Sequence, residues 1–244
     1  MRTTNPALNE RVFEVERGVA VSEPMTIRGA VNKTSFLLLM VTLSGAWVWS
    51  RVAATGALPA AVWVGAIGGF ITALVTIFKK EWSPATAPIY AVFEGAFLGG
   101  ISAVLEATYR GIVVDAVALT LGTLAALLIV YRARLIPVTQ NFRLGIVAAT
   151  GGICLVYLAT WVLGWFGIRV PFIHEGGVAG IAFSAFVVVI AALNLVLDFD
   201  FIEQGSGRNL PKYMEWYAAF GLLVTPVWLY VEILRLLTKL RSRR

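Results

Sequence analysis

The chain has 244 residues, of which 59% are hydrophobic and only 14% are charged. Because about a quarter of the residues in soluble domains are charged, this composition excludes an ordinary water-soluble protein and predicts an integral membrane protein in the lipid bilayer. The formal net charge of +6 comes mainly from the two ends and the short connections. Membrane proteins commonly place Lys and Arg there, so no nucleic-acid partner is predicted.

The first 33 residues are polar and contain several charged residues, Asn and Pro. They lack the apolar core of a cleavable signal peptide, so we interpret residues 1–33 as a leader in the cytosol. A transmembrane domain over residues 34–240 and a basic tail over residues 241–244 complete the predicted organisation.

Seven apolar segments are long enough to cross a bilayer, which takes about 20 residues of helix. They cover residues 35–52, 58–78, 84–109, 112–131, 144–166, 176–198 and 214–237. The connections are too short to form a soluble domain. We therefore predict an all-α, polytopic membrane protein that folds as a bundle of seven transmembrane helices.

The distribution of Lys and Arg favours a cytosolic N-terminus. With seven spans, this orientation places 12 of the 20 basic residues in the cytosol and the other 8 on the opposite face. The basic C-terminal end argues against it. If the last segment does not cross completely, both termini are cytosolic and the conflict disappears.

Glycines are frequent within the predicted spans, where small residues allow helix backbones to approach closely in lipid. Gly95 and Gly99 form a small-xxx-small pair on the third span, so we expect this helix in the middle of the bundle. The same packing role is expected for Gly65, Gly68, Gly69, Gly100, Gly145, Gly151 and Gly152.

Acidic residues within or bordering the spans are the informative feature, because a charge in hydrocarbon costs at least ~2.5–3.5 kcal/mol. Glu94 lies ten residues after Pro84, or about 15 Å along the helix, which is near the middle of the bilayer. The alternative for Glu94 is a protonated side chain that hydrogen-bonds a neighbouring helix.

The other acids fall into two layers by their position along the spans. One layer contains Asp198, Asp200, Glu203 and Glu215, and the opposite layer contains Glu106, Asp115 and Glu232. No Lys or Arg lies inside a span at comparable depth, except near span ends as at Arg235.

Carboxylates without basic partners can share protons or bind a cation, and hard ions such as Ca²⁺ prefer oxygen ligands. These acids therefore predict a pH-controlled cation path. Asn194, one helical turn before Asp198, favours a polar stripe that faces inward. The alternative for Asp198, Asp200 and Glu203 is a helix end that meets lipid headgroups.

Motifs of enzymes are missing from the sequence. The single histidine, His174, lies in a loop, and there is no HExxH motif, P-loop or paired CxxC motif. We therefore predict neither an enzymatic activity nor a cofactor.

Several stretches resemble the Bax inhibitor-1/YccA-like family of integral membrane proteins, in particular its bacterial members. They are "MTIRGAVNKT" before the first span, "PIYAVFEGAFLGGISAVLE" in the third, "ALNLVLDFDFIEQG" at the end of the sixth and "LYVEILRLL" in the seventh. The resemblance covers residues 25–240. It implies a seven-helix bundle with the last helix near the centre, located in the bacterial cytoplasmic membrane.

The resemblance further implies a pH-sensitive calcium leak in which two aspartates share a proton and gate the pore. Asp198 matches the first aspartate of that pair. In one register of the seventh span Glu232 is its partner. In the other register Thr225 occupies that position, and Glu215 is the nearest carboxylate.

We therefore expect a proton-regulated leak for calcium ions, with Asp198 and either Glu232 or Glu215 as the sensor. The expected ion path contains Glu94, Asp200, Asn194 and Glu106, and Asp198 and Glu94 are candidate Ca²⁺ ligands. The alternative is a membrane-embedded regulator whose leader and basic tail bind another protein, such as a membrane protease or a cell-death factor.

Overall fold

The computed structural model describes residues 23–57, 59–167 and 177–243. Seven helices in this part of the chain are long and apolar enough to cross a membrane. They are α2 (Ile27–Thr55), α3 (Ala60–Phe78), α4 (Ser83–Thr108), α5 (Ile112–Arg132), α6 (Gln140–Trp165), α8 (Val178–Gly207) and α9 (Met214–Arg241). A short 3-10 helix, η2 (Lys80–Trp82), precedes α4. The prediction of an all-α protein with seven spanning helices is confirmed.

Two helices extend well beyond the predicted spans. Helix α2 begins at Ile27, eight residues before the expected start, because Thr26 caps its first turn by accepting a hydrogen bond from the amide of Gly29. Helix α8 continues to Gly207, so the acids from Asp198 onwards lie inside a helix and not at its end. Apolar residues that alternate with these acids are buried, and their packing extends the helix.

The chain divides into two compact units, and each is described separately. The α2–α4 unit consists of described residues 23–110 and 200–224, which include helices α2, α3 and α4, the end of α8 and the start of α9. The α5–α6 unit consists of described residues 111–199 and 225–243, which include α5, α6, most of α8 and the rest of α9. Helices α8 and α9 therefore contribute to both units.

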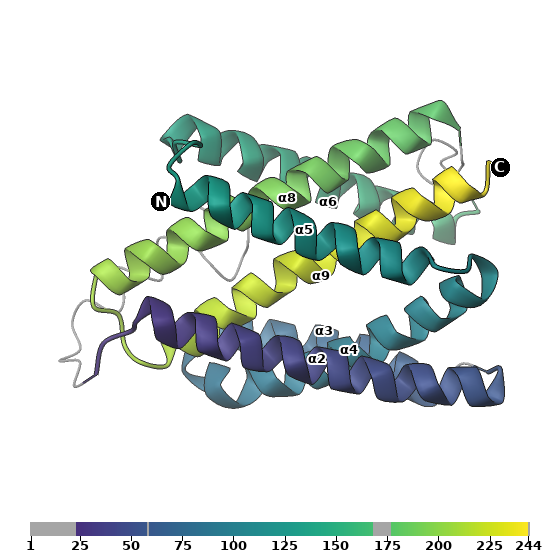
Figure 1. Cartoon of the computed structure of the whole chain (residues 1–244), viewed down its shortest axis with the longest axis horizontal. Helices are drawn as coiled ribbons and strands as arrows, with labels where there is room; N and C mark the ends of the chain where they lie inside the picture. The colour runs from purple at the N-terminus through teal and green to yellow at the C-terminus, as the bar shows by residue number, and fades with distance from the viewer. Residues whose placement is uncertain (1–22, 58, 168–176, 244) are drawn as a thin grey trace. The chain divides into compact units, whose positions relative to one another are not determined.

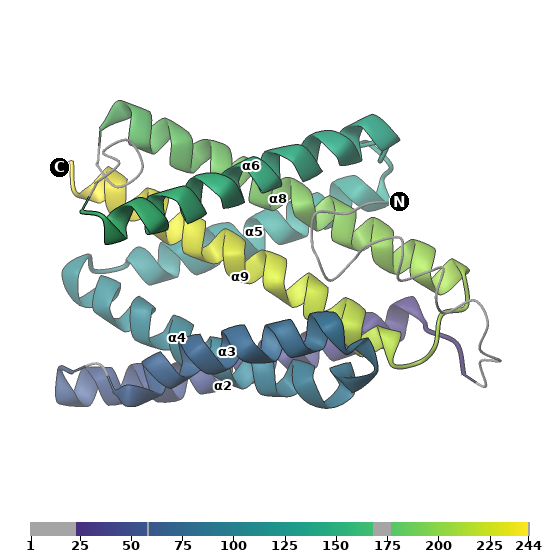
Figure 2. The same cartoon turned by 180° about the vertical axis from the view of Figure 1, so that it is seen from behind.

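In the α2–α4 unit, α4 packs against both α2 and α3 (Figures 1 and 2). A Cβ atom at Gly99 of α4 would lie only 2.7 Å from the Cα atom of Gly45 on α2. On the other side, a Cβ atom at Gly65 of α3 would lie 2.9 Å from the backbone nitrogen of Phe97. Within this unit, α4 therefore contacts both of the other spans through its small residues.

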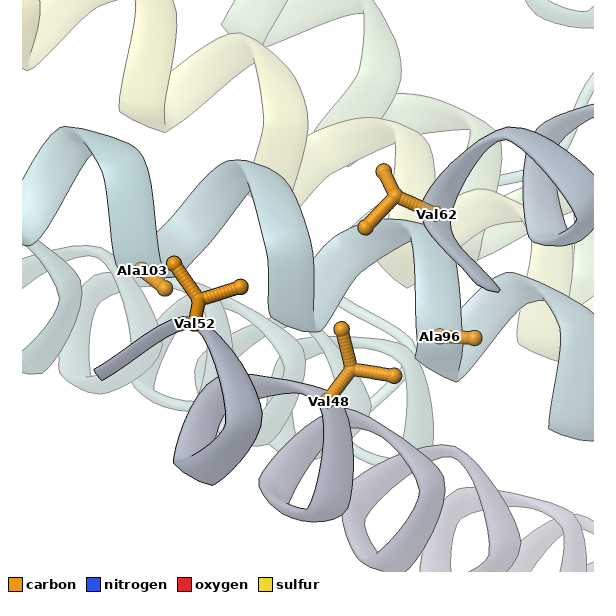
Figure 3. Packing of buried hydrophobic residues seen from close by; sticks show 5 residues of the cluster. All are labelled: Val48, Val52, Val62, Ala96 and Ala103. Carbon is orange, nitrogen blue, oxygen red and sulfur yellow. The ribbon is translucent and has the colours of Figure 1, made fainter. Parts of the chain in front are cut away.

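Small apolar side chains complete the contacts among these three helices. Figure 3 shows Val48 and Val52 of α2, Val62 of α3, and Ala96 and Ala103 of α4 in one buried cluster. Because these side chains are small, the three helices can approach as closely as they do at the glycines. Such close packing of small residues is typical of helices in lipid.

The glycines of α6 do not have the packing role expected from the sequence. A Cβ atom at Gly145, Gly151 or Gly152 would meet no atom within 4 Å. The expectation of close helix packing is wrong at these three positions, because composition alone does not show which face of a helix a glycine occupies.

In the α5–α6 unit, α6 and α8 lie side by side (Figures 1 and 2), and Ile153 packs against Val187 and Ile190. Tyr131 of α5 contacts Phe199 of α8 with ring centroids 5.7 Å apart. Of the spans in the described ranges, α9 is the most buried. In its most apolar stretch 56% of the residues are buried, compared with 11% for α2. This burial agrees with an interior position for the last helix.

The helices also expose many large apolar side chains, as expected of surfaces in contact with lipid. Strongly exposed examples are Trp63, Phe70, Phe78, Val114, Ile129, Trp165 and Phe166. The finding supports a multi-pass integral membrane protein.

The glycine contacts generate the first prediction. Replacing Gly99 with Leu should lower the free energy of unfolding by about 1–3 kcal/mol, because the new side chain would collide with the backbone of α2. The matched control, Gly151→Leu on α6, should change it much less, because its side chain enters open space. Thermal unfolding in detergent measures both. Equal destabilisation by the two variants would contradict the packing account.

Candidate functional site

The carboxylate of Glu215, in the first turn of α9, is fully buried and accepts hydrogen bonds from two segments. The backbone amide and the hydroxyl of Thr26 donate to its Oε1 atom at 2.9 and 2.8 Å. The ammonium group of Lys33 donates to its Oε2 atom. Lys212 lies 3.2 Å from Oε1. We call Thr26, Lys33, Lys212 and Glu215 the α2–α9 clamp.

The spacing of the α2 residues explains how this clamp forms. Thr26, Gly29 and Lys33 recur at i, i+3 and i+7, which places them on one face of a helix. Gly29 must be small, because a Cβ atom there would collide with the Glu215 carboxylate. Lys33 also lies over the ring of Trp216, 5.5 Å from its centroid.

Backbone contacts reinforce the same connection between the start of α2 and the α8–α9 loop. The amide of Met25 donates to the carbonyl of Leu210 at 2.6 Å, and Pro24 forms an isolated bridge with Pro211. The first turn of α2 is therefore held by charge, by hydrogen bonds and by the buried side chain of Met25.

A second buried carboxylate, Glu232, is held within the α5–α6 unit. The Tyr157 hydroxyl of α6 donates to its two oxygens at 3.1 and 3.0 Å, and the Trp228 indole donates at 3.3 Å. Arg235, one turn further along α9, donates at 2.9 Å and lies over the Tyr157 ring. We call Tyr157, Trp228, Glu232 and Arg235 the α6–α9 clamp.

The remaining basic residues of α9 also have partners in this unit. The buried Lys239 ammonium donates to the carbonyl of Gly180 at 3.0 Å and to the hydroxyl of Ser184 at 2.8 Å, both on α8. Arg241 forms an ion pair with Asp115 of α5 at 2.6 Å. The basic C-terminal end of the helix is therefore bound to protein, which weakens its value as a marker of membrane orientation.

These contacts correct one expectation from the sequence. Glu215, Glu232 and Asp115 were expected to lack basic partners, yet each forms an ion pair. The expectation failed because Lys33 was assigned to the leader, whereas it lies in α2. Long Arg and Lys side chains also reach carboxylates several residues away, so depth along the helix is not enough to judge pairing.

Asp198 lies on α8 and is only 1% exposed. One turn earlier, the Asn194 side-chain amide donates to the hydroxyl of Thr150 on α6 at 2.9 Å and to the carbonyl of Ile190 at 2.8 Å. Asn194 is therefore buried and hydrogen-bonded within the α5–α6 unit. Asp198 and Glu232 belong to the α5–α6 unit and Glu215 to the other.

Glu94 is half-buried on α4 and interacts with the hydroxyl of Tyr90, one turn earlier on the same helix. A Cβ atom at Gly69 of α3 would lie 3.3 Å from its Oε2 atom, so Glu94 points toward α3 where the glycine leaves room. Tyr90 packs edge-on against Phe220 of α9, with ring centroids 5.0 Å apart.

Other predicted path residues also lie in the α2–α4 unit. Asp200 accepts a hydrogen bond from the Gln204 amide at 2.7 Å, and Glu106 is half-buried late in α4. The described ranges contain no group of three or more His, Cys, Asp or Glu side chains placed to hold a metal ion. The candidate Ca²⁺ ligands Asp198 and Glu94 belong to different units, and His174 lies outside the described residues.

Sequence reasoning missed Thr26, Lys33 and Tyr157 as partners of the carboxylates. The i, i+3 spacing of Glu232 and Arg235 was a usable signal, because such residues are neighbours on a helix surface. The contacts of Glu215 with α2 and of Glu232 with Tyr157 join residues distant in sequence, and no local pattern indicates them.

The contribution of Lys33 to stability can be compared with that of Lys212. Lys212 forms an ion pair with the same carboxylate, but its side chain is 49% exposed. Lys33→Met should lower the free energy of unfolding by about 3 kcal/mol, because it removes the closer cation from a buried carboxylate. Lys212→Met should cost about 1 kcal/mol or less, since exposed ion pairs contribute little. Chemical denaturation in detergent measures both, and a larger cost for Lys212→Met would contradict the assignment.

A double-mutant cycle tests the α6–α9 clamp. Glu232→Gln and Arg235→Gln should each be destabilising, because each leaves a charge without its partner. The double variant should be less destabilised than the sum of the two, by about 0.5–3 kcal/mol, as for residues in contact. Strictly additive costs would show that the pair does not interact.

Comparison with known proteins gives one family. The family described as Bax inhibitor 1 like matches residues 5–242, which is nearly the whole chain. No curated protein matches the chain significantly, and neither does any solved structure.

Proposed function

We propose that this chain, which belongs to the Bax inhibitor 1 like family, is a pH-sensitive calcium leak in which Asp198 is the proton sensor. The observation that carries the proposal is the almost complete burial of Asp198, which is only 1% exposed. Its neighbours along α8, Leu195, Val196, Leu197 and Phe199, are apolar and buried as well. A carboxylate in such surroundings is stabilised by binding a proton or a cation.

The contacts of Glu232 and Glu215 indicate a structural role for these two carboxylates. Glu232 has the Arg235 guanidinium at 2.9 Å, and Glu215 has the Lys33 ammonium as a direct partner. A carboxylate that already has a basic partner gains less from a proton. We therefore assign Glu215 and Glu232 to holding α9. Glu232 occupies the second aspartate position in one of the two registers of the family resemblance, and Thr225 occupies it in the other.

Oxygen-bearing side chains near Asp198 and Glu94 support a cation as the transported species. Asn194 and Thr150 form a polar pair beside the Asp198 turn, and Tyr90 accompanies Glu94 in the other unit. Tight Ca²⁺ binding needs six to eight oxygens, and the described residues offer no such carboxylate cluster. Sparse ligands suit an ion that passes through, because conduction requires weak binding.

We infer that the chain lies in a bacterial cytoplasmic membrane with its N-terminus in the cytosol. The distribution of Lys and Arg in the sequence supports this orientation of the chain.

Calcium flux into proteoliposomes tests the sensor. The wild-type flux should change between about pH 5 and about pH 8, as the sensor gains or loses its proton, and Asp198→Asn should abolish that change because an amide does not titrate. The control Glu203→Gln removes an exposed acid from the same helix and should keep the wild-type response. A wild-type pH response in Asp198→Asn would reject the sensor.

The same experiment distinguishes the alternative function. Absence of flux at every pH, together with a membrane protease or a cell-death factor that co-purifies only when residues 1–22 are present, would favour a membrane-embedded regulator. The leader and the basic tail would then supply the contacts.

A further inference from the structure

Helix α9 is one continuous helix that contributes to both compact units. Its residues up to Val224 belong to the α2–α4 unit, and those from Thr225 belong to the α5–α6 unit. Pro226 follows directly after this division and lies inside the helix. The division of the fold and the helix-breaking residue thus coincide in the sequence.

Pro226 weakens the helix locally. It has no amide hydrogen, so the helical hydrogen bond to the carbonyl of Leu222 cannot form, and its ring crowds the preceding turn. Sharp bends in helices occur mainly at such positions. The neighbouring side chains of Leu222, Thr225 and Val227 are buried, so the weak point is enclosed by protein, where transmembrane helices tolerate proline.

Each side of Pro226 is held by a different clamp. Glu215 lies 11 residues before the proline and is bonded to Thr26 and Lys33 of α2. Glu232 lies six residues after it and is bonded to Tyr157 of α6 and to Arg235. Any bending between these fixed ends concentrates where the backbone bonding is weakest.

We propose that α9 is a jointed helix that bends at Pro226, between the α2–α9 clamp and the α6–α9 clamp. Each clamp holds one segment of the helix, and the weakened backbone at Pro226 lies between the two segments. Asp198 is the second-to-last residue of α8 in the α5–α6 unit, so the candidate sensor lies where the other shared helix also changes unit. A role of the joint in the pH response rests on the proposed function.

Hydrogen exchange of the full chain in detergent, followed by mass spectrometry, tests the joint. Pro226→Ala restores the missing amide and should slow exchange in the peptide spanning residues 219–230 about threefold or more. Pro226→Leu supplies the same amide with more bulk and serves as a second variant. The matched control, Pro88→Ala, changes a proline inside α4 and should leave that peptide unchanged.

The outcomes separate the joint from the proposed function. Slower exchange in both Pro226 variants, with Pro88→Ala unchanged, supports the joint whether or not calcium flux is observed. If the wild type shows pH-dependent flux, Pro226→Ala should also reduce the size of that response. Unchanged exchange in both Pro226 variants would overturn the joint, even if the pH-dependent flux of the wild type is present.

Discussion

The cost of placing carboxylates among apolar helices is the constraint on which the rest of the structure depends. Each such group needs a proton, a cation or a basic partner. Glu215 and Glu232 have basic partners, and both connect α9 to another helix. The burial of α9 follows from apolar packing, but its register against α2 and α6 is set at these two charged points.

The two clamps give the last helix different attachments at its two ends. In the α2–α4 unit, the start of α9 is bonded to Thr26 and Lys33 at the start of α2. In the α5–α6 unit, its second half is bonded to α6, and Lys239 connects it to α8. Pro226 lies between these attachments. The proline of α9 therefore lies between two segments that are each bonded to other helices.

The helices could be predicted from the sequence because hydropathy and length determine which segments cross a bilayer. The central place of α4 in its unit was also predictable, because Gly95 and Gly99 lie one turn apart. The start of α2 and the end of α8 could not be predicted in this way. Thr26 caps α2 before its apolar core begins, and buried side chains beyond Asp198 extend α8 past its apolar core. The ion pair of Glu232 with Arg235 follows from an i, i+3 spacing that the sequence contains, whereas the contact of Glu215 with Lys33 joins residues 182 positions apart and no local pattern indicates it.

We propose that Asp198 exchanges a proton, whereas Glu215 and Glu232 hold α9 through ion pairs with Lys33 and Arg235. Infrared difference spectroscopy of carboxyl groups, recorded between acidic and neutral pH, tests it most directly. The account predicts a protonated-carboxyl band that appears at acidic pH in the wild type, is lost in Asp198→Asn and persists in Glu232→Gln. A band that persists in Asp198→Asn and disappears in Glu232→Gln would contradict the account.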